Sequence, residues 1–141
     1  MKKYEYFEHT ADVKFKAYGK NLEESFGNAA LATFHVMVDP ETIKPLVRKS
    51  FGVKGHDLKA LLYNFLEELL FYLDSEHFIL SKVEKIKIDR MGDSYVLQAL
   101  VLGDKVKDEY DVSGDVKAVT YNDMEIHETS TGCSVQVVLD I

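Results

Sequence analysis

The segment from residue 57 to residue 73 constrains the fold more than any other part of this 141-residue sequence. It begins with Asp57, whose side chain suits a helix N-cap, and its apolar residues recur at the spacing of one helix face. This stripe consists of Leu58, Leu61, Leu62, Phe65, Leu66, Leu69, Leu70 and Leu73, with Tyr63, Phe71 and Tyr72 widening it. A partner groove or a cofactor pocket would also use such a stripe. Burial against a sheet explains it best, because sheet-packing helices need this face.

The remaining segments predict one further helix and a series of strands. Asn21, with Glu24 three residues later, has the pattern of a capping box, and an apolar face extends from there to Met37. Alternating patterns predict strands at 4–7, 13–19, 50–54, 83–90, 94–102, 116–121, 124–128 and 133–141. Two helices and about seven strands, grouped rather than alternating, predict an α+β fold. We expect one domain over 1–141, with one or more mostly antiparallel sheets and both helices packed on one face.

Composition narrows the classes of function. The net charge of −7 and the pI of about 5.2 disfavour a direct nucleic-acid binder, which needs a basic footprint. If the protein has a role in RNA metabolism, we therefore expect it to bind a protein partner with a basic surface rather than the RNA itself. The apolar runs are too short to cross a bilayer and the N-terminus lacks a signal-peptide pattern, so a cytoplasmic protein without a membrane partner is predicted. The single cysteine, Cys133, is expected to be a buried, inert thiol.

Motifs for enzymatic chemistry are absent from the sequence. The five histidines lack HxH or HExxH spacing, and there is no GxSxG, P-loop or GxGxxG pattern. The acidic stretch between residues 103 and 115 lacks the register and glycine of an EF-hand. We therefore expect a solvated acidic loop there, including Asp104.

The last predicted strand places two carboxyl groups side by side. Alternation assigns Cys133, Val135, Val137, Leu139 and Ile141 to the core face and Asp140 to the opposite face. The α-carboxylate of Ile141 would then be held beside the Asp140 side chain. Adjacent carboxylates repel each other unless a positive charge lies between them, which makes this end of the strand a candidate site.

A second polar segment, Phe7-Glu8-His9-Thr10-Ala11-Asp12-Val13, joins the first two strands. His9, Thr10 and Asp12 carry groups that bind metals or move protons, but Thr10 and Asp12 equally suit a turn in which they bond to backbone amides. If the first and last strands are neighbours, Asp12 would meet Asp140 and Ile141. Such a set of oxygen ligands suits Ca²⁺ or Mg²⁺.

The motifs taken together resemble the archease family. The resemblance rests on the 7–13 segment, Ala17-Tyr18-Gly19, Asn28-Ala29-Ala30, the 57–70 helix, Val116-Lys117-Ala118-Val119-Thr120-Tyr121 and the terminal Val138-Leu139-Asp140-Ile141. It covers essentially the whole chain in the same order. Two positions depart from the family pattern: Asn122 stands where histidine is common, and the chain has no tryptophan.

This resemblance implies an accessory protein for RtcB-type tRNA-splicing RNA ligases. Archease-like proteins promote guanylylation of the ligase's active-site histidine, support multiple turnover and broaden NTP use, so tRNA would be met only through the ligase. The family also carries a divalent cation, most often Ca²⁺, with Mg²⁺ or Mn²⁺ as alternatives, and its ligands correspond to Asp12, Asp140 and Ile141. His9 and Lys117 lie in matching motifs and could support activity. Either a structural or a mechanistic ion fits these ligands.

Two other classes of function stay open at the level of sequence. A small metal-dependent phosphoester hydrolase could use Asp12, Asp140 and a bound water, although a base with its own orienting partner is missing. A general chaperone or passive binding module would need no site at all.

Overall fold

The computed structural model describes residues 2–8 and 11–141, and its strands and helices follow the predicted order. The elements are β1 (Tyr4–Phe7), β2 (Asp12–Gly19), α1 (Leu22–His35), the short 3-10 helix η1 (Pro40–Thr42), β3 (Val47–Gly55), α2 (Leu58–Glu76), β4 (Phe78–Met91), β5 (Ser94–Lys105), β6 (Ala118–Thr129) and β7 (Gly132–Asp140). The predicted α+β class, with seven strands and two α-helices among the described residues, is confirmed.

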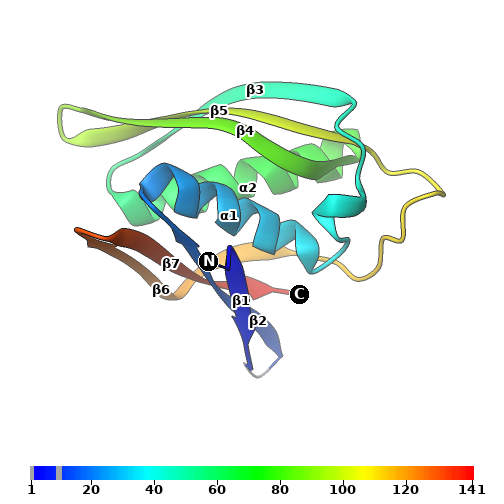
Figure 1. The fold of residues 1–141 in the computed structure, drawn as a ribbon, viewed down its shortest axis with the longest axis horizontal. Helices are drawn as coiled ribbons and strands as arrows, with labels where there is room; N and C mark the ends of the chain where they lie inside the picture. The colour runs from blue at the N-terminus through cyan, green and yellow to red at the C-terminus, as the bar shows by residue number, and fades with distance from the viewer. Residues whose placement is uncertain (1, 9–10) are drawn as a thin grey trace.

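The strands form two antiparallel sheets with the helices between them. One sheet has the order β1-β2-β7-β6 and the other β3-β5-β4, and Figure 1 shows α1 and α2 as the middle layer. Each sheet therefore has helices on one face, as predicted, while its other face is uncovered by helices. The prediction left the number of sheets open, and the structure has two.

Both helices begin where the sequence indicates. The Asn21 side chain accepts a hydrogen bond from the Glu24 amide at 2.9 Å, and the Glu24 carboxylate accepts one from the Lys20 amide at 3.0 Å. At the start of α2, the Asp57 side chain accepts from the Ala60 amide at 2.7 Å. These bonds satisfy amides that would otherwise lack a partner in the first helical turn.

The apolar stripe of α2 forms the centre of the core. The Phe65 ring stacks between Phe26 of α1 and Phe51 of β3, with centroid separations of 6.5 and 6.0 Å. The predicted burial of this stripe is confirmed, except that Phe71 is 57% exposed and does not widen it. Cys133 is also buried, as predicted. It accepts a hydrogen bond from the Ser25 hydroxyl at 3.1 Å, and burial raises the pKa of its thiol.

The region predicted as two strands with a turn at residues 122–123 is a single strand, β6. Its pairing with β7 shifts register between Thr120 and Glu125, and Asp123 has a positive φ of 52°. The turn-forming residues are thus absorbed in an irregularity within the strand rather than reversing the chain. Residues 121–124 of β6 stand opposite the single residue Val137 of β7, and this bulge accommodates three extra residues and a left-handed backbone.

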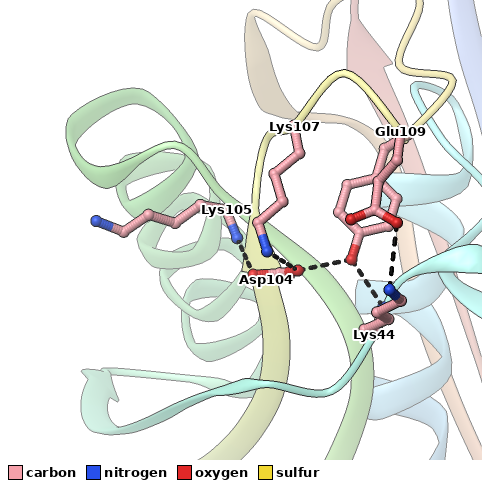
Figure 2. A network of polar contacts seen from close by, with 6 residues as sticks. Lys44, Asp104, Lys105, Lys107 and Glu109 are labelled. Carbon is pink, nitrogen blue, oxygen red and sulfur yellow. Dashed lines mark hydrogen bonds and ion pairs between the residues drawn. The ribbon is translucent and has the colours of Figure 1, made fainter.

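The prediction of a solvated acidic loop is wrong for Asp104. This residue belongs to β5 and is only 3% exposed. Its carboxylate accepts hydrogen bonds from the Tyr110 hydroxyl at 2.6 Å, the Lys107 ammonium at 3.0 Å and the Lys105 amide at 2.8 Å (Figure 2). The first two bonds lower the pKa of Asp104 to about 2, because they favour the charged form.

This network attaches the segment between β5 and β6 to the rest of the molecule. The Tyr110 hydroxyl also accepts from the Lys44 amide at 3.2 Å, and the Ser113 amide donates to the Met37 carbonyl at 2.8 Å. Val116 is buried near the end of the segment. The segment therefore leads into β6 in a defined position, which matters because Lys117 is its last residue.

Candidate functional site

Asp12 and Asp140 come from opposite ends of the chain and lie directly opposite each other in the β2–β7 pair. Directly opposed residues in an antiparallel pair project from the same face of the sheet, with Cβ atoms about 5 Å apart. The neighbouring residues Val13 and Leu139 form the next pair, and Leu139 is fully buried against the helix layer. Asp12 and Asp140 thus share the face that points away from the helices.

The start of β6 lies next to Asp140 on the other side of β7. We call Asp12, Asp140 and the adjoining start of β6 the Asp12–Asp140 row. Ala118 is the register partner of Asp140 on the other side of β7, and the Lys117 amide donates a hydrogen bond to the Asp140 carbonyl at 2.8 Å. The structure therefore brings the backbone of Lys117, named by its motif, directly beside Asp140.

Sequence reasoning missed the residue that positions this part of β6. β6 is an edge strand, and the Glu67 carboxylate of α2 accepts a hydrogen bond from the Val119 amide at 2.7 Å. Glu67 lies on the margin of the apolar stripe and is only partly exposed. An acidic residue beside an otherwise apolar helix face was the available signal, because a partly buried carboxylate needs hydrogen-bond donors.

Ile141 differs from its predicted environment. It lies just beyond the end of β7 and its side chain is 43% exposed, so its assignment to the core face is wrong. The reason is that β2 has no further residue to pair with it, because Asp12 is the first residue of that strand. Its backbone is still only one residue from the Asp140 side chain.

The connection between β1 and β2 carries the other predicted residue, His9, which lies outside the described residues. The adjoining Ala11 has a left-handed backbone with φ of 62°, a conformation typical of tight turns.

An open hollow of about 770 Å³ adjoins Asp12. Its described lining also includes Tyr6, Phe7, Glu8 and His35. The Tyr6 hydroxyl donates to the Ala32 carbonyl of α1 at 2.6 Å, and burial raises the pKa of Tyr6 above its usual range. The hollow extends to His35 on the helix side of the sheet, whereas the Asp12 side chain shares the opposite face with Asp140.

These residues fit a hard divalent cation only as an incomplete cage. No group of three or more His, Cys, Asp or Glu side chains that could hold a metal occurs within residues 2–8 and 11–141. Asp12 and Asp140 would supply two carboxylates and the backbone of Ile141 a further oxygen ligand. Oxygen ligands of this kind, completed by water, suit Ca²⁺ or Mg²⁺ rather than Zn²⁺.

Comparison with known proteins decides the family. The sequence model of the archease protein family matches residues 4–141. The archease of Methanosarcina mazei is 40% identical over 141 residues, covering 99% of this chain and 97% of that protein. The archease of Methanothermobacter thermautotrophicus is 40% identical over 141 residues, covering 100% of both. The chain belongs to the archease family.

Solved structures of similar proteins agree with this assignment. The solution structure of a Methanobacterium thermoautotrophicum protein has a TM-score of 0.85 and 37% identity, with full coverage of both chains. A Thermotoga maritima archease, described as a possible chaperone, shares the fold alone, with a TM-score of 0.55 and 17% identity over 96% of this chain and 94% of that one. As for membranes, none of the helices among the described residues of this archease is long and apolar enough to span one.

Proposed function

We propose that this archease is an accessory activator of an RtcB-type tRNA-splicing RNA ligase. It promotes guanylylation of the ligase's active-site histidine and multiple turnover, and broadens the NTPs that the ligase uses. It acts in the cytoplasm, meets tRNA only through the ligase, and is not itself the catalyst. The family membership supports this proposal, and the resemblance in the residues at Asp12, Lys117 and Asp140 supports it further.

The observation that carries the proposal is the direct register of Asp12 with Asp140. Like charges directly opposite each other in a sheet are destabilising, and a cation bound between the two carboxylates would offset their repulsion. Asp12, Asp140 and Ile141 are the proposed ligands, and Ca²⁺ is the proposed ion. When bound, the cation would neutralise the carboxylates and present positive charge to phosphate oxygens.

The neighbouring residues have supporting roles in this proposal. The Lys117 ammonium is exposed beside the row and would bind a phosphate of the nucleotide or of the guanylylated ligase. The bond from its amide to the Asp140 carbonyl holds the backbone of Lys117 beside Asp140. Glu67 positions the same strand through Val119. His9 is proposed as a further activity-supporting residue.

The test is turnover by a purified RtcB-type ligase, followed as guanylylated ligase and as joined RNA. We expect the wild-type archease to accelerate both, and we expect Asp12→Ala, Lys117→Ala and a C-terminally extended form to lose most of that effect. Lys59→Ala, which changes an exposed lysine at the start of α2, serves as the matched control. Equal ligase rates with and without the wild-type protein would refute the proposal.

Two further assays separate the alternative functions. Chelator-sensitive hydrolysis of phosphoesters by the protein alone would indicate a hydrolase. Suppressed aggregation of unrelated proteins would indicate a general chaperone, the description attached to the Thermotoga maritima relative. We expect neither activity from the wild-type protein.

A further inference from the structure

The outer face of the β3-β5-β4 sheet gathers positive charge in an otherwise acidic chain. We call this surface the basic face and define it by the outward-pointing residues of the three strands. Its cations are Arg48 and Lys54 on β3 and Lys82, Lys85 and Lys87 on β4. These five are drawn from 17 lysines and arginines, in a chain with net charge −7. Figure 1 shows that no helix or strand covers this side of the sheet.

The middle strand, β5, contributes a mainly aliphatic row between the two rows of cations, interrupted by the exposed Gln98, which pairs with Gly52 and Lys87. Leu102 pairs with Arg48 on one side and Lys82 on the other, and Leu100 pairs with Ser50 and Lys85. Further along, Val96 pairs with Lys54 and Asp89. Leu100, Leu102 and Val96 are all partly exposed, because the aliphatic stems of lysine and arginine shield such rows while their charges stay in water.

Acidic groups neutralise only part of the basic face. Lys82 is 3.7 Å from Glu84, and Lys87 is 3.7 Å from Asp89. Within the described part of the chain, Arg48, Lys54 and Lys85 have no carboxylate at ion-pair distance. The unneutralised cations therefore lie on both flanks of the aliphatic row, two on β3 and one on β4.

We propose that the basic face docks an acidic amphipathic helix of a partner protein. Strands lie about 4.8 Å apart, so the two cation rows are about 10 Å apart, which matches the diameter of an α-helix. The distance from Val96 to Leu102 is about 20 Å at 3.4 Å per residue, which matches about 14 helical residues. Apolar side chains of such a helix contact β5, and acidic side chains on its two sides pair with β3 and β4.

A nucleic acid fits this surface less well. Non-specific binding of single strands relies on aromatic side chains that stack with bases, and the described outward residues of these strands include no aromatic ring. Tyr95 is on the inner side with Arg90, whose guanidinium lies 5.8 Å from its ring. Phosphate groups would also make no favourable apolar contact with the aliphatic side chains of β5. The charge and the apolar row together favour a protein helix.

This docking surface is independent of the proposed metal ligands. The basic face belongs to β3, β4 and β5, whereas Asp12 and Asp140 belong to the other sheet, across the helix layer. A partner could therefore hold this face while the Asp12–Asp140 row stays accessible. Failure of one proposal leaves the other unaffected.

The test uses a fluorescent peptide of about 14 residues, with leucines on one helical face and glutamates on both sides of them. We expect saturable binding to the wild-type protein, measured by fluorescence anisotropy, that weakens as salt is added. Arg48→Glu combined with Lys85→Glu should weaken it about tenfold or more, because two exposed ion pairs are lost and replaced by repulsion. Leu100→Gln should weaken it at unchanged charge, and Lys59→Glu is the control for charge outside the face.

Two comparisons decide the nature of the occupant. A peptide with glutamine in place of glutamate should bind weakly, and a labelled oligouridylate should bind more weakly than the acidic peptide. Tighter binding of the oligouridylate that depends on Arg48 and Lys85 would identify a polyanion surface and overturn the proposal. No binding of the acidic peptide by wild-type protein, or equal binding by the double variant with an unchanged melting curve, would overturn it as well.

Discussion

Replacing Asp140 with asparagine should have opposite effects on stability with and without calcium. In the cation-free protein, the carboxylates of Asp12 and Asp140 are directly opposed on one sheet face. A neutral amide removes that repulsion and should stabilise the fold by about 0.2–1 kcal/mol. The backbone bond from the Lys117 amide to the Asp140 carbonyl is unaffected, because it does not use the side chain.

Calcium should reverse this order of stability. At a concentration of about 100 times its dissociation constant, an ion that binds only the folded protein adds about 2.7 kcal/mol. A chain of this length gains about 3–5 °C in melting temperature per kcal/mol. The wild-type protein should therefore melt about 8–13 °C higher in calcium than in chelator. Asp140→Asn should gain only a small part of that rise, because it lacks one of the proposed ligands.

The assay is thermal unfolding followed by circular dichroism, in chelator and across a calcium titration. Asp111→Asn is the matched control, since it removes one exposed carboxylate from the segment between β5 and β6. The control should follow the wild type in both conditions. Equal calcium-dependent shifts for wild type and Asp140→Asn, or no shift for either, would refute the assignment of Asp140 as a ligand.

Three further predictions concern the fold. Phe65→Ala should lower the free energy of unfolding by about 3–5 kcal/mol in urea titrations, because Phe65 is fully buried between two rings; a loss below about 1 kcal/mol would contradict this role. Gly103→Ala should cost about 1–3 kcal/mol, since its added Cβ would lie 2.0 Å from the Ile79 carbonyl oxygen. Gly52→Ala, whose Cβ meets only the Gln98 side chain, should be nearly neutral in the same titrations. For Asp104, whose pKa falls from 3.8 to about 2 on folding, stabilisation should be complete above pH 4 and decline as the pH falls towards 2; Asp104→Asn should remove this part of the acid dependence.

Local patterns predicted the helices because their signals are contained in short segments. The Asn21 and Asp57 caps and the stripe around Phe65 need no knowledge of distant residues. The division of the strands into two sheets depends on pairing between distant segments, which alternation alone does not encode. The same limit explains β6, where Asn122 and Asp123 have turn chemistry but the adjoining strand imposes a bulge.

The candidate site was partly predictable for a related reason. Alternation placed Asp140 opposite the core face, and the adjacency of Asp12 was predicted on the condition that the first and last strands are neighbours. In the structure it is the second strand, β2, that pairs with β7, and this pairing brings Asp12 opposite Asp140. Glu67 was not predictable as a partner of Val119, because nothing in a single sequence joins a helix margin to one edge-strand amide. Asp104 was wrongly predicted to be exposed because the segment that follows it is acidic overall. Within that segment, however, Tyr110 and Lys107 donate the hydrogen bonds that allow the Asp104 carboxylate to be buried.

The position of β7 has a consequence for biosynthesis. It is the last strand in sequence, yet it lies between β2 and β6 in its sheet. During synthesis, β2 and β6 must wait for residues 132–140 before either gains this neighbour, so one whole layer of the molecule closes late. The Asp12–Asp140 row exists only once β2 and β7 have paired, so a cation held there would bind only a chain in which these two distant strands have come together.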